Sequence, residues 1–359
     1  MAKELDQLLQ HTSEWLRGVG PVSEIVVSSR IRLARNLEKI PFTTRATKQS
    51  QADVLRVVKD ALPQVTSLNQ ATLFELGELD EVDRQFLVER HLISREHATH
   101  AEHHAVTVGH GEVISIMVNE EDHLRIQVMQ SGLNLRDAWT IMDALDDELS
   151  AALPFAYSTD WGYLTCCLTN AGTGMRASVM MHLPALVITK QINKVLHAIT
   201  KLGLTARGLY GEGTEAQGNF FQISNQVTLG RTEEELIENI ERILKQVLDH
   251  EQTAREGLVA NNRLQLEDRI WRAYGLLRYA QTITSNETLD LLSAVRLGVD
   301  LGMMTNGVLG KPLDRSAVND LLIFSQPAHL QKLEGGKLSA KERDIKRATL
   351  VRKRLGGKV

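Results

Sequence analysis

The sequence predicts an α/β domain with a partly antiparallel sheet, followed by a smaller all-helical domain. Segments in which apolar and polar residues alternate, as in strands, occur only before about residue 255. Helical patterns separated by glycine-marked turns lie between them, at about 47–62, 79–91, 134–152, 185–202 and 232–250. Beyond residue 255 only helical patterns remain. We therefore expect a domain over 1–255, with helices covering one face of its sheet, and a helical domain over 256–359.

The chain begins with an amphipathic helical pattern from Leu5 to Leu16, which glycines and a proline end at residues 18–21. A strand pattern follows over residues 24–34. Its odd positions are mainly apolar, whereas Ser28, Arg30 and Arg32 share the opposite face because side chains alternate along a strand. The two arginines are therefore expected to point the same way.

Three further strands are predicted to present polar side chains. Residues 104–130 read as consecutive strands joined by a short turn, with Arg125 on the polar face. In the strand over 176–183, Arg176 lies on the polar face. In the segment 161–168, the alternation places Cys167 on the polar side and Cys166 in the core.

Composition restricts the class of protein. The chain has 359 residues, 43% of them apolar, and a net charge of −4, which is typical of a globular protein. No signal-like or membrane-length apolar run is present, and the two cysteines are adjacent, so a disulfide scaffold and a four-cysteine zinc site are excluded. We expect a cytoplasmic protein. The tail 337–359 holds nine Lys or Arg against two acids, which suits either an acidic, nucleic-acid or phosphorylated partner or a solvated helix end.

Arginines on polar strand faces suggest a site for a polyphosphate. Arg30, Arg32, Arg125, Arg176 and Arg207 stand in four separate segments, and convergent cations need an anion to offset their repulsion. Arginine forks bind phosphate oxygens bidentately and stay charged. The chain has no P-loop motif, and the loose dinucleotide pattern that starts at Gly211 is disfavoured because Glu212 inside it would repel a pyrophosphate.

Two glutamates supply the complementary half of such a site. Glu121 and Glu212 could hold a guanidinium, aim one of its nitrogens at a γ-phosphorus and accept a proton. Each could instead be an ordinary solvated acid. Arginines beside Cys167 would favour its thiolate form, which could accept a hydrogen bond from the guanidinium. The alternative is that the thiol is merely packed.

These motifs, from Ser28 to Arg32, Asn119 to Arg125, Thr165 to Val179 and Arg207 to Glu212, resemble in order and spacing those of the phosphagen (guanidino) kinases. The resemblance covers about residues 22–250. It implies a mostly antiparallel sheet flanked by helices, MgATP as phosphoryl donor and no protein side chain as a direct metal ligand. It also implies catalytic roles for Glu121, Glu212 and Cys167. The ATP-binding positions that it implies are Ser28, Ser29, Arg30, Ile31, Arg32, His91, Arg125, Arg176, Ala177, Ser178, Val179, Met180, Arg207, Gly208, Leu209, Tyr210, Gly211 and Glu212.

The chain departs from the small-molecule phosphagen kinases at both ends. Those enzymes carry about a hundred helical residues before the first motif, whereas the motif here begins at residue 28, and the helical extension after 255 is foreign to them. The arrangement resembles the bacterial protein-arginine kinases, which mark proteins for Clp protease degradation. The resemblance implies arginine-containing protein substrates, an activator protein, a role in protein quality control and stress response, and a homodimer.

The basic tail contains a second motif. Arg343, Asp344, Arg347 and Ala348 resemble the phosphoarginine-binding motif of that family, and the two arginines share a helix face at i and i+4. The resemblance implies an allosteric site for the product.

Two other functions remain open at this point. One is a kinase for free arginine or another small guanidino compound, against which the absent N-terminal domain argues. The other is a non-catalytic phosphoarginine-binding adaptor, against which the carboxylate pair and the five arginines argue. DNA binding is not expected, because the sequence contains no basic recognition helix with a supporting fold signature. A membrane partner is not expected either.

Overall fold

The computed structural model describes residues 2–208, 217–304 and 313–356. The chain forms two compact units. The first comprises Met1–Trp15, Ser28–Val179 and Ser224–Glu241, and the second comprises Leu16–Val27, Met180–Ile223 and Arg242–Val359. Mostly antiparallel strands with flanking helices, and a helical C-terminal region, confirm the predicted fold class.

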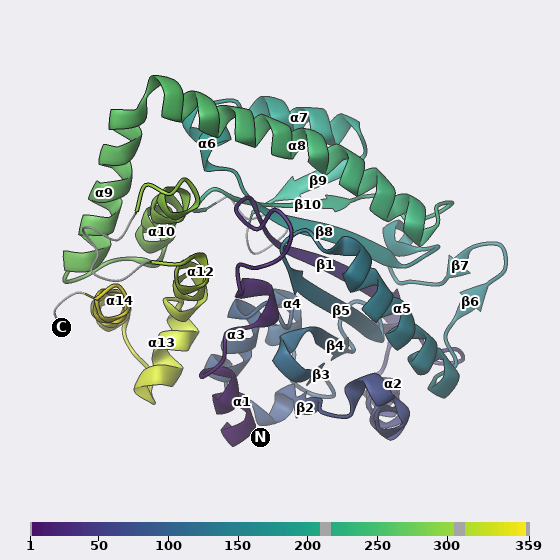
Figure 1. The fold of residues 1–359 in the computed structure, drawn as a ribbon. Coiled ribbons are helices and arrows are strands. Elements are labelled where there is room, and N and C mark those ends of the chain that lie inside the picture. Colours follow the sequence, from purple (N-terminus) through teal and green to yellow (C-terminus); the bar gives the residue numbers. More distant parts are fainter. Residues whose placement is uncertain (1, 209–216, 305–312, 357–359) are drawn as a thin grey trace. The chain divides into compact units, whose positions relative to one another are not determined.

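Within the described part of the chain, eight strands form the main sheet in the order β2-β3-β4-β5-β1-β8-β10-β9 (Figure 1). Neighbouring strands from β2 to β1 pair antiparallel. The strands are β1 Val26–Arg35, β2 Thr72–Glu75, β3 Ala105–Val108, β4 Ile114–Val118, β5 Leu124–Ser131, β8 Met175–His182, β9 Leu204–Arg207 and β10 Phe220–Asn225. A separate hairpin consists of β6 Tyr157–Ser158 and β7 Gly162–Tyr163.

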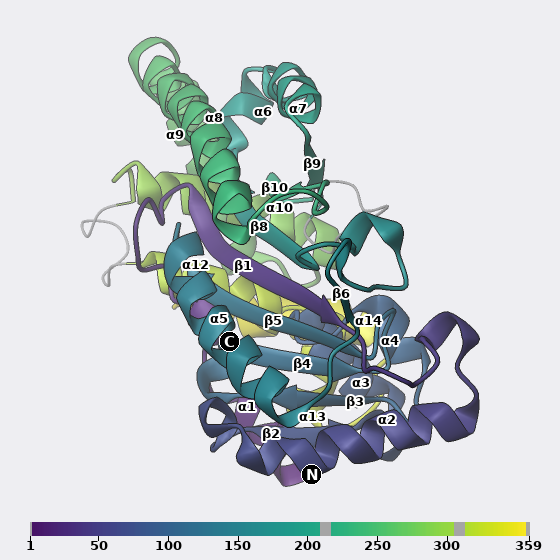
Figure 2. The same ribbon diagram turned by 90° about the vertical axis from the view of Figure 1, so that its right-hand side faces the viewer.

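Helices cover both faces of the sheet in the first unit, which corrects the expectation of one covered face. Helix α5 lies against β5 (Figure 2), on the face from which Arg35 of β1 points to Asp146 of α5. The segment of α3 and α4 lies on the other face, where Gln127 of β5 donates to the His91 carbonyl. The helices of this unit are α1 Ala2–Leu8, α2 Lys48–Ala61, α3 Glu81–Glu89, α4 Arg95–Thr99 and α5 Leu135–Ala152.

The second unit is mainly helical. Its helices are α6 Pro184–Ile188, α7 Ile192–Lys201, α8 Glu233–Asn261, which begins in the first unit, α9 Arg263–Tyr279, α10 Ser285–Asp300, α12 Arg315–Phe324, α13 Pro327–Glu334 and α14 Ala340–Arg354. After residue 255 the described residues contain helices and no strand, as predicted. None of the described helices combines the length and apolarity that crossing a bilayer requires.

Side-chain caps explain where several predicted helices begin. Thr47 accepts from the Ser50 amide at 3.2 Å, and Ser50 returns a bond, so that a capping box starts α2. Ser339 and Glu342 form the same box at α14. The predicted helix over 185–202 is two helices, α6 and α7, because the chain turns at Lys190 with a positive φ of 59°. The predicted N-terminal helix ends at Leu8, earlier than expected.

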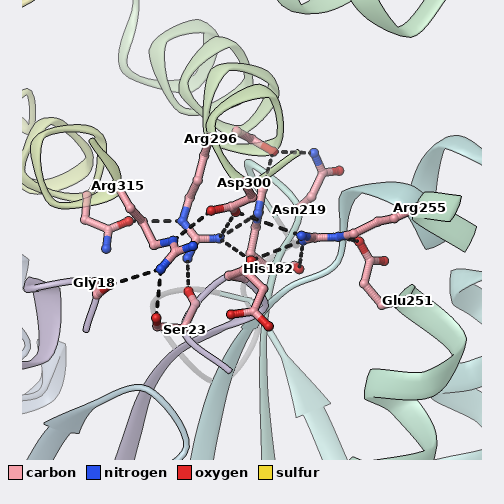
Figure 3. Close-up of polar contacts among 12 residues, drawn as sticks. Gly18, Ser23, His182, Asn219, Glu251, Arg255, Arg296, Asp300 and Arg315 are labelled. Atoms are coloured by element: carbon pink, nitrogen blue, oxygen red, sulfur yellow. Dashed lines mark hydrogen bonds and ion pairs between the residues drawn. The ribbon is translucent and has the colours of Figure 1, made fainter. Parts of the chain in front are cut away.

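A buried network of charged side chains organises the second unit (Figure 3). Arg296 of α10 is fully buried and donates to His182 Nδ1 at 2.8 Å, to Asn319 Oδ1 at 3.1 Å and to the Ser23 carbonyl at 2.8 Å. Asp300 accepts from Arg315 at 2.7 Å and lies 3.4 Å from Arg296. Burial lowers the pKa of Arg296 to about 10, although the carboxylate of Asp300 acts to raise it. The network therefore joins α10 and α12 to residues 16–27 and to the end of β8.

The same network fixes the state of His182. A guanidinium can only donate, so His182 Nδ1 is the acceptor, and the proton on Nε2 is directed to Ser293 Oγ at 2.8 Å. Burial, together with Arg296 and Arg255, holds the pKa of His182 well below its usual value. The imidazole is therefore neutral, as its partners require.

Replacing Arg296 by alanine should destabilise the second unit by about 3–5 kcal/mol, because Asp300 and several carbonyls would lose a buried donor. Urea unfolding combined with hydrogen exchange of α10 peptides measures this loss. Arg269, which is exposed on α9, supplies the control, and Arg269→Ala should change stability by at most about 0.5 kcal/mol. Equal stability of the two variants would contradict the assignment.

Candidate active site

Strand register places the predicted arginines on one face of the sheet. Arg30 pairs with Met129, Arg32 with Gln127, and Ala34 with Arg125 across β1 and β5. Directly paired residues point to the same face, so Arg30, Arg32 and Arg125 share it, as their alternation predicted.

Strand β8 brings the fourth arginine to this face. Arg30 Nε donates to Ser178 Oγ at 3.4 Å, and Ser178 Oγ lies 3.5 Å from the Arg30 carbonyl. Arg176 precedes Ser178 by two residues and therefore lies on the same side of β8. Four of the five predicted arginines thus come together in the first unit.

A pocket opens at this surface, entirely within the first unit. It is lined by Arg32, Leu33, Ala34, Glu121, Asp122, Arg125, Asn170, Gly174 and Arg176. Three of the five predicted arginines and the carboxylate of Glu121 therefore share one cavity, which Asp122 also lines.

The cations of the pocket disturb one another. Burial, then repulsion by Arg125 and Arg176, lowers the pKa of Arg30 to about 9. Burial and repulsion by Arg30 also hold the pKa of Arg32 well below its usual value. Arg32 Nε is buried and has no hydrogen-bond partner among the described residues. The pocket therefore contains, at Arg32, a buried donor to which an anionic ligand could supply the missing acceptor.

The two neighbouring glutamates have different environments. Arg125 Nη1 donates to both carboxylate oxygens of Glu120, at 2.8 and 3.0 Å. Burial would raise the pKa of Glu120, but Arg125 and the Glu121 amide hold it at about 2. Glu121 is exposed at the edge of the pocket. Partial desolvation of its carboxylate, and then repulsion from Asp122, raise its pKa, while Arg125 acts in the opposite direction. Sequence reasoning missed Glu120, because spacing alone does not say which of two adjacent acids pairs with Arg125.

The turn between β4 and β5 places Glu121 at the pocket. Asn119 adopts a positive φ of 64°, and its amide donates to the His123 carbonyl at 2.9 Å. The Asn119 side chain donates to the carbonyls of Gln51 and His103 at 2.9 and 2.8 Å. Asparagine tolerates this left-handed backbone well, so the residue suits both the turn and its anchoring.

Asp122 and His123 fix the same turn through hydrogen bonds to other segments of the first unit. Asp122 accepts from Asn36 at 2.6 Å and from the Cys166 amide at 2.7 Å. His123 Nδ1 accepts from the Leu37 amide at 2.9 Å, so its Nε2 proton faces the Pro41 carbonyl at 3.0 Å. These bonds use Asp122 structurally and leave Glu121 as the carboxylate that can act on a ligand.

The cysteine segment differs from its prediction. Only Gly162–Tyr163 within 161–168 is a strand, so the alternation used to assign the two cysteines does not apply. Both are half-buried, and Cys166 is therefore not a core residue. Cys166 Sγ lies 3.3 Å from Thr43 Oγ1, which also donates to the Glu121 carbonyl, whereas Cys167 Sγ lies 3.0 Å from Thr169 Oγ1. Burial raises the pKa of Cys166.

Arg35 anchors the loop that closes the pocket, although the sequence analysis did not single it out. It is 1% exposed, and its fork donates to Asp146 at 3.0 and 2.8 Å. Another of its nitrogens donates to the Thr173 carbonyl at 2.9 Å, and the guanidinium lies 3.4 Å from the centre of the Tyr163 ring. Gly174, with a φ of 66°, must be glycine because a Cβ there would lie 2.6 Å from Arg35 Nη1.

His91 lies near this arginine face, where its carbonyl accepts from Gln127, and the ATP contact that the resemblance implies for it stays a prediction. It has a positive φ of 60°, and its ring stands edge-on to Trp15 with centroids 5.1 Å apart. Burial, followed by repulsion from Arg30 and Arg95, lowers its pKa to about 3. A neutral His91 can accept or donate a hydrogen bond without adding charge to the site.

The remaining predicted positions fall into three groups. Ser28, Ile31, Ala177, Val179 and Met180 are buried in β1 and β8, and Ser29 Oγ donates to the Gly132 carbonyl at 2.9 Å, so these residues build the strands that carry the arginines. Arg207 and Gly208 belong to the second unit. Leu209, Tyr210, Gly211 and Glu212 lie outside the described residues.

Comparison with known proteins identifies the family. Residues 53–254 match the ATP:guanido phosphotransferase, C-terminal catalytic domain, and residues 263–358 match the Protein-arginine kinase McsB C-terminal domain. The chain is 48% identical over 350 residues to a protein-arginine kinase of Halothermothrix orenii, with 98% of each chain covered. It is 50% identical over 347 residues to that of Desulforamulus reducens, covering 96% of this chain and 95% of the relative. The chain belongs to the protein-arginine kinase family.

Solved structures agree with this assignment. A taurocyamine kinase from Schistosoma mansoni, solved with transition-state analogue components, is 30% identical with a TM-score of 0.59, over 66% of this chain and 34% of that one. A lombricine kinase is 25% identical with a TM-score of 0.57, over 66% and 69% of the two chains. The protein is thus a guanidino phosphotransferase with a phosphagen-kinase-like fold, and the family implies that it uses ATP.

Replacing Arg32 by methionine should have opposite effects on ligand binding and on stability. The affinity for ATP should fall about tenfold or more, because a charge-assisted phosphate contact is lost. The ligand-free protein should become more stable by about 1 kcal/mol, because repulsion among buried cations is relieved. Calorimetric titration with ATP and urea unfolding without it measure the two effects.

The matched control is Arg56→Met on α2, an exposed arginine outside the pocket. It should leave the ATP affinity unchanged. If Arg32→Met destabilised the ligand-free protein and left ATP binding intact, Arg32 would be a structural residue.

Proposed function

We propose that this protein transfers the γ-phosphoryl group of ATP to arginine side chains of proteins. The observation that carries the proposal is the shared pocket, in which Glu121 faces Arg32, Arg125 and Arg176. Both matched domains and the named relatives at up to 50% identity support a protein-bound arginine as acceptor. We assign the triphosphate to the arginines and the acceptor guanidinium to the carboxylate.

The reaction follows from these positions. The acceptor guanidinium is a weak nucleophile because its lone pair is delocalised. Glu121 would orient it, with one nitrogen in line with the γ-phosphorus, and accept the proton that this nitrogen loses as the N–P bond forms. The bond from the γ-phosphorus to the β,γ-bridging oxygen breaks, and ADP leaves with that oxygen. Arg32, Arg125 and Arg176 stabilise the charge on the phosphoryl oxygens and on the leaving group.

Glu120 gives Arg125 a fixed orientation in this mechanism. The ion pair uses only Nη1 of Arg125, which contacts both oxygens of Glu120, and it therefore leaves Nε and Nη2 for phosphate. We propose Glu212 as the second carboxylate, His91 and Arg207 as further ATP contacts, and Cys167 as a hydrogen-bonding partner of the acceptor.

We propose that Mg²⁺ accompanies ATP. Among the residues that the structure describes, no three His, Cys, Asp or Glu side chains are placed to hold a metal ion. The three arginines of the pocket cannot coordinate a metal ion, and they suit a cation that arrives bound to the phosphates. When bound, Mg²⁺ would neutralise charge on the β- and γ-phosphates.

The tail motif is proposed as an allosteric phosphoarginine site. Arg347 is 2% exposed and donates to the Ser325 carbonyl at 2.7 Å, the Ile283 carbonyl at 2.9 Å and Asp344 at 2.5 Å. Arg343 is half-buried on the same helix, and Ala348 is buried. A phosphate at this motif would therefore meet Arg343 first, and engaging Arg347 would loosen its links to the start of α10.

The cellular role is proposed from the same family membership. We infer a cytoplasmic homodimer that works with an activator protein and marks proteins for Clp protease degradation. A kinase of free arginine and a non-catalytic phosphoarginine adaptor are the alternatives. Incubation with MgATP and either an unfolded arginine-rich protein or free arginine distinguishes these three functions. A protein-arginine kinase should consume ATP with the unfolded protein and not with free arginine. A kinase of free arginine should show the reverse, and an adaptor should consume ATP with neither.

Replacing Glu121 by glutamine should lower kcat for protein phosphorylation by about 10²–10⁴-fold, because the proton acceptor is lost while the shape is kept. ATP affinity should change little. Mass spectrometry of phosphoarginine in a model protein measures the product. Glu81→Gln on α3, an exposed acid of the same unit outside the pocket, should retain full activity. Full activity of Glu121→Gln would refute the role of Glu121.

The rate should also fall at acidic pH, with an apparent pKa above the ordinary 4.5 of a glutamate. The carboxylate must be ionised to accept a proton, and its raised pKa means that protonation begins at a higher pH, so activity is lost as pH falls through that value. Initial rates of ADP formation measure the profile without depending on the acid-labile product. An acidic limb at or below 4.5, or an unchanged limb in Glu121→Gln, would contradict the assignment.

A further inference from the structure

Three large apolar side chains are exposed in residues 157–168, just before the pocket residue Asn170. Tyr157 is 61% exposed, Trp161 60% and Leu168 86%. We call these three residues the apolar rim. Such side chains, gathered in one short segment, often mark an interaction surface.

The apolar rim is joined directly to the pocket. Leu168 precedes the pocket residue Asn170 by two positions. Trp161 precedes Gly162, which is bridged to Gly172, two positions before the pocket residue Gly174. Consecutive Cα atoms are about 3.8 Å apart, so Trp161 and Leu168 lie within roughly 15 Å of the pocket. About five extended residues span this distance.

The segment presents these side chains from a fixed backbone. Tyr163 N donates to the Gly172 carbonyl at 2.8 Å, and Leu164 N to the Ala156 carbonyl at 2.9 Å. The Tyr157 and Tyr163 rings pack edge to face with centroids 5.3 Å apart, and Arg35 lies over the Tyr163 ring. Figure 1 shows the β6-β7 hairpin projecting from the sheet of the first unit. A preformed surface of this kind loses little conformational entropy when it binds.

We propose that the apolar rim binds the chain of the substrate on either side of the acceptor arginine, and that it selects extended segments with an apolar side chain within about five residues of that arginine. The inference rests on the proposed function and adds its substrate class. The pocket itself contacts the guanidinium, which is the same in every arginine, so discrimination between arginines has to come from neighbouring residues. Apolar side chains beside an arginine are accessible in an unfolded chain and buried in a folded one, so the apolar rim would favour unfolded substrates.

The test uses the full-length protein and two peptides that each contain one arginine and have the same length and net charge. One carries leucine and phenylalanine three residues before and after the arginine, and the other carries serine at both positions. The wild-type enzyme should phosphorylate the apolar peptide with a kcat/KM about tenfold higher or more, the size expected for covering one large apolar side chain. The double variant Trp161→Ser, Leu168→Ser should lose this preference and keep the wild-type kcat/KM on the serine peptide.

The control is Leu264→Ser on α9, which removes a side chain that is 76% exposed outside the apolar rim and should keep the preference. Equal rates of the wild type on both peptides would overturn the inference and leave the proposed function intact. Phosphorylation of neither peptide nor of an unfolded protein would overturn the proposed function itself. Loss of activity on both peptides in the double variant, or a changed molar mass in light scattering, would instead identify the apolar rim as a structural or self-association surface.

Discussion

Repulsion among half-buried arginines is the constraint on which the catalytic unit depends. Arg30, Arg32, Arg125 and Arg176 share one face of β1, β5 and β8. Burial and the neighbouring arginines lower the pKa of Arg30 and Arg32, whereas the ion pair with Glu120 raises the pKa of Arg125. A sheet can hold such a cluster because its backbone hydrogen bonds fix side-chain positions that flexible loops would let drift apart. Binding energy from a polyphosphate can then offset the repulsion, which links the stability of the site to its ligand.

The structure uses buried guanidinium groups in two opposite ways. Arg35 and Arg296 are among the largest fully buried side chains of the described residues, and their nitrogens donate to carboxylates and backbone carbonyls. Arg32, in contrast, has a buried Nε without a partner among the described residues. Burying a polar group without a hydrogen bond is unfavourable, so natural proteins retain it mainly where function requires it. Arg35 and Arg296 therefore use their hydrogen bonds to hold the fold, whereas Arg32 keeps a buried nitrogen whose hydrogen bond a ligand could supply.

Alternation along strands was sufficient to predict the arginine face, because the two-residue period of a strand is independent of tertiary context. It gave the correct side for Arg30, Arg32 and Arg125. The same rule was wrong for Cys166, since residues 164–168 are not a strand and are held instead by bonds to distant residues such as Asp122. The choice between two adjacent acids for the partner of Arg125 was equally inaccessible, because spacing does not say which of them forms the ion pair, and this is why Glu120 was missed. The roles of Arg35 and Arg296 depend on side chains more than a hundred positions away, which no local pattern encodes.

The division of labour between Glu120 and Glu121 explains how a carboxylate can remain available among so many cations. An isolated glutamate beside Arg125 would form the ion pair itself and lose its capacity to accept a proton. Glu120 takes this position and stays ionised, with a pKa of about 2. Glu121 is thereby left with a raised pKa at the exposed edge of the pocket. A weaker acid is a better proton acceptor, and a carboxylate at the edge can reach a guanidinium that arrives on a protein chain. Because Glu120 forms the ion pair with Arg125, the carboxylate of Glu121 can share the pocket with the phosphate-binding arginines and still accept a proton.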